Sequence, residues 1–277
     1  MKDVLSKHNV HERDKWIKFY YQGHRYEIGN DKGTKYTSVT TWCHTHFPKF
    51  NADAVIESMM KGKNWNPENK YWGLTPQQIK AQWQNNGSKE GTHLHSQIEI
   101  FMNNANVQKN YNHTDLLHYY QEENKENANV SKEWSYFIQF IRDFPDLKPF
   151  RTEWLIYDED LKIAGSIDMI YENEDGTLSI YDWKRCKEIT EANNWNKHAL
   201  TDCISHMPDT NFWHYALQLN TYKTILERKY GKVVKELFLV RLHPEATEET
   251  YELISVPFLV TELDALFQKR LESVSTN

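Results

Sequence analysis

The sequence predicts an α/β fold with a central mixed β-sheet flanked by helices, and the order of its elements carries this prediction. Helical patterns dominate the first half of the chain, and three strand patterns rich in Ile, Tyr and Thr follow at 151–157, 163–172 and 177–184. A long amphipathic helix at 211–229 then leads to another strand at 236–242. Short turns favour antiparallel pairing of the first three strands, whereas the helical crossover permits a parallel partner.

The segment before these strands is predicted to begin with a hairpin around a Gln22-Gly23 turn, with strands at 17–21 and 25–28. Residues 36–41 are expected to be extended. Helices are predicted next, at about 52–62, 75–86 and 89–104, and Thr75-Pro76 is a favourable start for the second of them.

The stretch from Asn103 to Asn129 is polar and rich in Asn and Glu, so we expect a loosely packed helical insert there. A helix at 132–144 should end at Pro145, and Gly231 should close the long helix in a left-handed conformation. We expect a single domain over residues 1–277, with a helical insert at about 50–150 and a strand and helix extension over 241–277.

Composition indicates a globular protein of a reducing compartment. Of the 277 residues, 26% are charged and 14% aromatic. No apolar run approaches the roughly 20 residues of a membrane span, and the N-terminus lacks the apolar core of a secretory signal. Three scattered cysteines are too few for a disulfide framework or a four-thiolate iron–sulfur cluster. We therefore expect an intracellular protein, cytoplasmic or nuclear, with no membrane partner. The net charge of −6 provides no global attraction for nucleic acid.

The hairpin predicted over residues 163–184 carries the most informative side chains. If Gly176 takes the left-handed position of a three-residue turn, the strand register follows. Asp168 then stands opposite Asp182, with Cβ atoms roughly 5 Å apart. Lys184 follows two residues later on the same face of the sheet, because strand side chains alternate.

Two carboxylates this close repel one another unless a proton or a cation lies between them. A divalent metal with oxygen ligands is the natural occupant, and a lysine beside it suits an anionic substrate. A solvated hairpin face is the alternative explanation of the same triplet. Ile170 and Ile180 share the carboxylate face, so this face is partly apolar, which favours the metal site.

Two further pairs are spaced four residues apart on predicted helices, so the members of each pair project from one flank. In the first pair, His95 either completes the metal site or simply hydrogen-bonds to Glu99. In the second pair, Gln218 and Tyr222 have equally ordinary explanations as a surface amide and a core ring.

Five short segments occur in a fixed order along the chain: Tyr36-Thr-Ser-Val-Thr40, Gly91-Thr-x-x-His95-x-x-x-Glu99, Gly165-Ser-Ile-Asp168, Asp182-Trp-Lys184 and Gln218-x-x-x-Tyr222. This order resembles the RecB-type branch of the PD-(D/E)XK nuclease superfamily over about residues 36–240. Within that branch the chain looks most like stand-alone mitochondrial-genome-maintenance-type exonucleases and the nucleases of large DNA viruses and phages. The resemblance implies a restriction-endonuclease-like core with a helical arch built by the insert.

The resemblance also implies a metal site and a catalytic set. Mg²⁺ or Mn²⁺ would be ligated by His95, Asp168, Asp182 and the carbonyl of Trp183. The residues acting in catalysis would be Asp168, Asp182, Lys184, Gln218 and Tyr222. Lys184 would orient or help deprotonate the attacking water, Gln218 would hydrogen-bond near it or to a phosphate, and Tyr222 would pack beneath or touch DNA. Candidates for a supporting or second-metal role are Glu99 and Glu153.

Contacts to DNA would come from Ser38, Thr40, Arg185, Lys187, Gln218 and Tyr222. Two features depart from parts of the family. The cysteines cannot build the iron–sulfur cluster that several relatives carry, and Arg185 stands where many relatives have a small hydroxyl residue. The chain also has no helicase motif, so we expect a nuclease without a fused motor.

The expected function is metal-dependent hydrolysis of DNA in replication, repair or recombination, with a preference for single strands or free ends. An arch formed by the insert would pass a single strand to the metal, and replication or recombination proteins are the expected partners. The tryptophans in or near the insert would then be base-stacking platforms or, as their more ordinary role, core residues: Trp42, Trp65, Trp72 and Trp83. A structure-specific or RNA-directed endonuclease on the same core, or a DNA-binding module without catalysis, are the alternatives.

Overall fold

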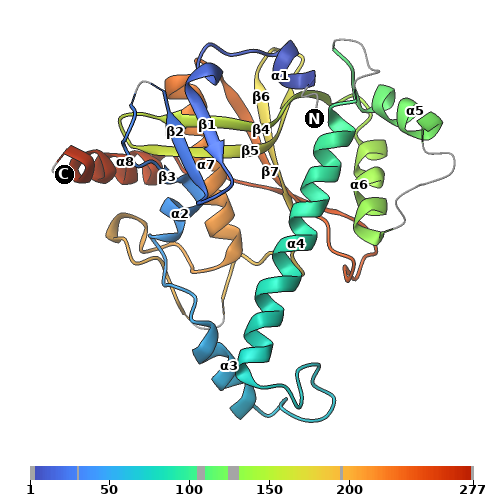
Figure 1. The fold of residues 1–277 in the computed structure, drawn as a ribbon, viewed down its shortest axis with the longest axis vertical. Coiled ribbons are helices and arrows are strands. Elements are labelled where there is room, and N and C mark those ends of the chain that lie inside the picture. Colours follow the sequence, from blue (N-terminus) through green and yellow to red (C-terminus); the bar gives the residue numbers. More distant parts are fainter. Residues whose placement is uncertain (1–3, 30, 105–109, 124–130, 194–195, 276–277) are drawn as a thin grey trace.

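A six-stranded mixed β-sheet forms the centre of the molecule, and helices lie against both of its faces (Figure 1). The computed structural model describes residues 4–29, 31–104, 110–123, 131–193 and 196–275, apart from the side chains of 84–88. The α/β class and the mixed sheet expected from the sequence are therefore confirmed. A separate two-stranded sheet pairs β1 (Ile17–Tyr20) with β2 (Arg25–Ile28).

Three antiparallel strands form the middle of the large sheet: β4 (Lys148–Asp158), β5 (Ile163–Glu172) and β6 (Leu178–Lys184). The strand β7 (Val234–Arg241) runs parallel to β6, and β8 (Glu252–Ser255) closes that edge in antiparallel fashion. The helix α7 (Asn211–Lys229) makes the crossover to β7. Gly231 follows it with φ of 61°, and the Lys232 amide donates to the Leu226 carbonyl, which satisfies the end of the helix.

The hairpin between β5 and β6 has the expected register. Gly176 has φ of 78°, and the Asn173 amide donates to the Thr177 carbonyl over 2.8 Å. The ladder then runs from Glu172 opposite Leu178 to Met169 opposite Tyr181. A three-residue turn with a left-handed glycine thus fixes which side chains meet across the two strands.

One edge of β5 is shared by two neighbouring strands. The short strand β3 (Thr37–Ser38) pairs in parallel with Ile163 and Ala164, whereas β6 pairs from Met169 onward. In the described part of the chain no ladder pair on this edge falls between Ala164 and Met169. The two neighbours therefore diverge beside Asp168, and the candidate site lies at this point.

The alternation of side chains divides the core between the two faces of the sheet. Ile170 and Ile180 pack with α7 and with two further helices, α2 (Val39–His44) and α8 (Val260–Ser275). Met169 and Tyr181 pack on the opposite face against α4 (Pro76–Met102), α5 (His113–Glu123) and α6 (Lys132–Asp143). Asp168, Asp182 and Lys184 have the parity of the isoleucines and so belong to the α7 side.

Two expectations about the N-terminal half are wrong. Residues 39–41 are not extended but begin α2, because the Ser38 hydroxyl accepts from the Thr41 amide and caps a helix there. The helices expected at 75–86 and 89–104 are one helix, α4, of 27 residues. It starts with a capping box between Thr75 and Gln78, and it lacks an internal proline that would break it.

The remaining elements are short or belong to the expected insert. They are α1 (Val4–His8), a 3₁₀ turn at Asp14–Trp16, α3 (Ala52–Lys61) and a 3₁₀ turn at Asp202–Ile204. Parts of the polar stretch expected at 103–129, namely 105–109 and 124–129, lie outside the described residues. Within the described ranges, no helix has the length and apolar character needed to cross a membrane.

Candidate active site

Asp168 stands at the centre of the candidate site, between acidic residues of the two adjacent strands. On β4, the pairs Thr152–Met169 and Trp154–Ile167 leave Glu153 opposite Asp168. On β6, Asp182 follows Tyr181, the last residue of the ladder with β5, and its carboxylate interacts electrostatically with Asp168. The Trp183 amide donates to Asp168 Oδ2 over 3.2 Å. Three strands thus contribute one carboxylate each to a single row.

Glu153 has an unusual backbone, with φ of 43° in the left-handed region that non-glycine residues rarely adopt. The Ser166 hydroxyl donates to Glu153 Oε2 over 2.8 Å and fixes the side chain. Burial, together with the Asp168 carboxylate, raises the pKa of Glu153 to about 7. A strained residue with a perturbed pKa is typical of a functional position.

His95 reaches this row from α4. Its Nδ1 atom lies 3.5 Å from Asp168 Oδ2, and its Nε2 atom lies 2.9 Å from the Trp183 carbonyl oxygen. A neutral imidazole that donates from Nε2 to this carbonyl turns the Nδ1 lone pair toward Asp168. A backbone carbonyl that orients a histidine in this way is common around metal-ligating histidines.

The donor atoms of His95, Glu153 and Asp168 all lie within 4.8 Å of one another, and this is the group among the described residues that could hold a metal ion. Its chemistry fits a divalent cation, because two acidic groups and one imidazole lone pair converge where burial makes their mutual repulsion costly. Of the expected ligands, His95 and Asp168 are members. Glu153, which the sequence indicated only as a supporting candidate, is the third.

Asp182 lies beside this group and is tied to Lys184. Its side chain is 2% exposed and forms an ion pair with the Lys184 ammonium group. Burial and the Asp168 carboxylate raise the pKa of Asp182 to about 6. Burial lowers the pKa of Lys184, but Asp182 and Asp168 outweigh it and raise that pKa above its usual range. Lys184 therefore carries a full positive charge at neutral pH.

The helix α7 supplies Gln218 and Tyr222 behind β5. The Gln218 amide donates to the Tyr222 hydroxyl over 3.3 Å, and the Thr40 hydroxyl donates to Gln218 Oε1 over 3.5 Å. A Cβ atom at Gly165 would meet a Tyr222 ring carbon at 2.7 Å, so glycine is required for this ring to lie against the strand. Burial, together with the charges of Asp168 and Asp182, raises the pKa of Tyr222 well above its usual range.

The other expected contact residues occupy different settings. Ser38 caps α2. Glu99 was expected in a supporting or second-metal role, and its charge contributes to the raised pKa of Glu153. Arg185 is held by two carboxylates, with Nη1 2.6 Å from Glu90 and Nε 3.0 Å from Glu133. In contrast, the Lys187 side chain is 68% exposed.

Sequence reasoning missed Tyr215 and His44. The Lys184 ammonium group lies 4.4 Å from the centre of the Tyr215 ring, one helical turn before Gln218. His44 lies at the end of α2, and burial, with His214 and Lys184 nearby, lowers its pKa. The spacing from Tyr215 to Gln218 was available as a signal. The position of His44 was hidden because the sequence did not predict α2: residues 36–41 were expected to be extended, and no element was expected at residue 44.

A family model for the PD-(D/E)XK nuclease superfamily matches residues 78–276. The chain belongs to this superfamily. It is therefore a nuclease by family, and the central mixed sheet flanked by helices is consistent with the restriction-endonuclease-like fold. The match includes His95, Asp168, Asp182 and Lys184. It begins later than the range 36–240 expected from the motifs, at residue 78, and continues past the C-terminal end of that range.

Solved structures with limited similarity include a candidate exonuclease from Eubacterium rectale. It has 14% sequence identity and a TM-score of 0.39, over 87% of this chain and 78% of that one. The protein SSO0001 has 13% identity and a TM-score of 0.32, over 86% of this chain and 75% of that one. No curated protein matches this chain significantly.

Proposed function

We propose that this PD-(D/E)XK protein is a metal-dependent deoxyribonuclease, and that it acts as an exonuclease on single strands or on DNA with free ends. The observation that supports metal dependence best is the convergence of His95, Glu153 and Asp168 within 4.8 Å, next to the Asp182–Lys184 ion pair. Acids, an imidazole and an ammonium group side by side suit hydrolysis of a phosphodiester.

Mg²⁺ or Mn²⁺ would be held by His95, Asp168 and Glu153, with Asp182 as a further oxygen donor. When bound, the ion supplies an electrophile that activates water and offsets negative charge on the scissile phosphate. The Trp183 carbonyl fixes the His95 ring through the bond to Nε2, which is a role in orienting a ligand.

Lys184 would bind the phosphate and orient the attacking water. In the metal-free protein the Asp182 and Asp168 carboxylates raise the pKa of Lys184, so its ammonium group stays charged and suits a phosphate oxygen. Asp182 keeps Lys184 in position through their ion pair, and the Tyr215 ring covers the ammonium group from the α7 side. The hydrogen bonds from Thr40 to Gln218 and from Gln218 to Tyr222 hold these three side chains in place behind β5.

Dependence on a strand end is supported by the shape of the molecule. The helix α3 and the first half of α4 project away from the sheet (Figure 1). The second half of α4 carries His95, whose ring contacts Asp168 and the Trp183 carbonyl. A substrate that has to pass such a projection reaches the site most easily from an end.

Cleavage assays test this proposal. The purified protein is incubated with Mg²⁺, Mn²⁺ or EDTA and with labelled DNA and RNA, each as linear single strands, duplexes and closed single-stranded circles. We expect linear DNA to be degraded only with metal, and circles to survive. Asp168→Asn should be inactive, while the matched variant Asp175→Asn, at the exposed tip of the same hairpin, should behave like wild type.

Each alternative has its own outcome in these assays. Rapid cutting of circles would contradict the exonuclease and favour a structure-specific endonuclease, and cleavage of RNA alone would favour an RNA-directed enzyme. A protein that binds DNA but neither binds Mn²⁺ nor cleaves any substrate would be a binding module.

A further inference from the structure

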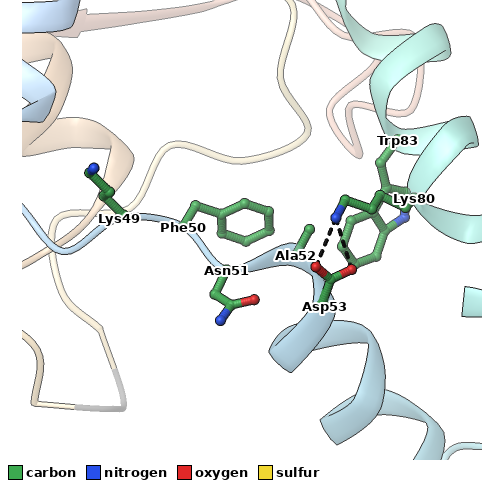
Figure 2. A pocket seen from close by; sticks show the side chains of 7 residues that line it. All are labelled: Lys49, Phe50, Asn51, Ala52, Asp53, Lys80 and Trp83. Carbon is green, nitrogen blue, oxygen red and sulfur yellow. Dashed lines mark hydrogen bonds and ion pairs between the residues drawn. The ribbon is translucent and has the colours of Figure 1, made fainter. Parts of the chain in front are cut away.

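A second hollow lies outside the candidate metal site, where the start of α3 meets the first half of α4. It has a volume of about 610 Å³, which is within the range of ligand pockets. Figure 2 shows the Phe50 ring on one side of it and Trp83 on the other, with the ion pair of Asp53 and Lys80 next to Trp83. Phe50 precedes α3 in the chain, whereas Lys80 and Trp83 belong to α4.

Aromatic rings form a short row along this pocket. The centres of Phe50 and Trp83 are 6.3 Å apart, and those of Trp83 and Tyr71 are 6.1 Å apart. Phe50 is 74% exposed, and Trp72, which contacts Trp65, is 46% exposed. Large exposed aromatic rings that cluster beside a cavity indicate a binding surface, and an aromatic face stacks well with a nucleobase.

The charge of the segment around the pocket is opposite to that of the whole chain. Residues 49–80 contain five lysines and three acidic residues, although the protein has a net charge of −6. Local positive charge next to aromatic rings is the usual combination in sites that bind single-stranded nucleic acid. Electrostatic attraction to a phosphate backbone would thus be concentrated on this part of an otherwise acidic protein.

The polar groups inside the pocket suit the edge of a base better than a phosphate. Both carboxylate oxygens of Asp53 accept from the Lys80 ammonium group, over 2.9 and 2.8 Å, so this lysine is already neutralised. A carboxylate repels a phosphate, but it accepts hydrogen bonds from base amino or imino groups, while the ammonium group donates to base carbonyls. Lys49, at the rim, remains available to a phosphate outside the pocket.

We propose that this pocket binds a base of single-stranded DNA at a distance from the site of cleavage, and this rests on the proposed function. A single strand is required because bases within a duplex are already paired and stacked, so their faces are not free. The helix α4 joins the two sites: Trp83 and His95 are twelve residues apart on it, or about 18 Å along its axis. That length corresponds to about five stacked nucleotides at roughly 3.4 Å each.

The length of the substrate provides the test. Kinetics are measured for Phe50→Ala and Trp83→Ala on oligothymidylates from about 3 to about 25 nucleotides, and on the chromogenic ester thymidine 5′-p-nitrophenyl phosphate. We expect KM to rise about 10-fold for strands longer than about eight nucleotides, with no change for the shortest strands or the ester. Such a rise matches the loss of one base–aromatic stack.

Two kinds of control accompany these variants. Tyr21→Ala removes an aromatic ring that is 91% exposed in the turn between β1 and β2, so KM should not change at any length. Phe50→Tyr and Trp83→Phe keep an aromatic face and should restore the wild-type KM on long strands. Since Phe50 is exposed, its alanine variant keeps the core intact even if Trp83→Ala folds poorly.

Several outcomes would overturn the proposal. An equal loss at all lengths would show a structural role, no loss at any length would show that the pocket is not used by DNA, and a loss confined to oligouridylates would assign it to RNA. If wild type cleaves nothing, the proposed function fails separately. The pocket is then tested by fluorescence anisotropy of a labelled oligothymidylate of about 15 nucleotides in EDTA, where Phe50→Ala should still weaken binding about 10-fold.

Discussion

Glu153 of β4 lies opposite Asp168 of β5, and its half-buried carboxylate, on a residue with a left-handed backbone, is within reach of the Asp168 and His95 donor atoms. Without a cation the Glu153 and Asp168 carboxylates repel one another. This repulsion, together with burial, raises the pKa of Glu153 to about 7. A bound metal ion would relieve that repulsion.

Metal binding should depend on Asp168. We expect calorimetric titration with Mn²⁺ to give a saturable heat for wild type and none for Asp168→Asn. The variant removes the carboxylate that lies at the centre of the group, between the acidic residues of β4 and β6. Asp175→Asn serves as the matched control, since Asp175 belongs to the same hairpin but is 51% exposed at its tip. Equal binding by wild type and Asp168→Asn would contradict the assignment of the metal site.

Glu153→Gln should stabilise the metal-free protein at pH 8 and leave its stability almost unchanged at pH 4. Above pH 7 the native protein holds a charged carboxylate that is half-buried next to Asp168, whereas the unfolded chain holds it in water. As pH falls from 7 toward 4.5, Glu153 takes up a proton in the native state before it does so in the unfolded chain. The destabilisation caused by its charged carboxylate therefore disappears, and the free energy of unfolding of wild type rises. The difference at pH 8 should reach up to about 3 kcal/mol, from the shift of the pKa.

Urea unfolding of both proteins in EDTA, at pH 4 and pH 8, measures this difference. Adding Mn²⁺ at about 100 times its Kd should stabilise wild type by about 2.7 kcal/mol and Glu153→Gln by less, because the variant lacks one ligand. A stabilisation of equal size at both pH values would show that the effect does not come from ionisation of Glu153.

Lys184→Ala should lower the cleavage rate by roughly 10²–10³-fold, as expected when a charged group is removed from a reacting phosphate. Binding of Mn²⁺ should persist, because Lys184 is not a ligand. Lys235→Ala is the control, since Lys235 lies on the neighbouring strand β7 and is 60% exposed. Thermal melting of both variants checks that they are folded at the assay temperature, and unchanged cleavage by Lys184→Ala would refute its role.

Gly165→Ala and Gly91→Ala should have opposite effects on stability. The added Cβ at Gly165 would meet the Tyr222 ring at 2.7 Å and Val39 at 3.1 Å, so we expect a loss of about 1–3 kcal/mol. At Gly91, in α4, no atom lies within 4 Å of the added Cβ, and we expect a gain of about 1 kcal/mol from helix propensity. Denaturant melts measure both, and a neutral Gly165→Ala would mean that the Tyr222 ring moves freely.

Arg185 and Lys187 should differ in their contribution to DNA binding. Arg185 is 13% exposed and held by Glu90 and Glu133, whereas Lys187 is 68% exposed and forms a surface ion pair with the equally exposed Glu245 at 3.5 Å. We therefore expect Lys187→Ala to reduce the salt dependence of DNA affinity by about one phosphate contact, and Arg185→Ala to leave that slope unchanged while destabilising the fold. Anisotropy titrations at several salt concentrations compare the two slopes.

The hairpin register was predictable because local chemistry determines it. A glycine after Asp175 and alternating strand patterns on both sides determine which residues pair across the hairpin. The long helix α7 is predicted by the period of its apolar residues and by Gly231 at its end. These elements depend on residues close together in the chain. The sequence could therefore indicate that Asp168 and Asp182 are neighbours before any tertiary contact was known.

The position of Glu153 was not predictable in the same way. Its carboxylate joins the group through an unusual φ value and through pairing of β4 with β5, and neither leaves a signature in residue spacing. Similarly, Ser38 was expected within an extended segment over residues 36–41, whereas its hydroxyl caps the start of a helix. The metal-ligand group and the surroundings of Lys184 depend on long-range packing that single-sequence patterns do not record.

The continuity of α4 would fix the distance between the proposed base-binding pocket and the proposed cleavage site. Because one uninterrupted helix carries both Trp83 and His95, the helical rise per residue determines the distance between the pocket that would bind the strand and the site that would cut it. Digestion should then slow at a limit product of about five nucleotides, which is too short to occupy both positions. Inserting seven residues between them would preserve the helical face, lengthen the interval by about 10 Å and enlarge that product by about three nucleotides.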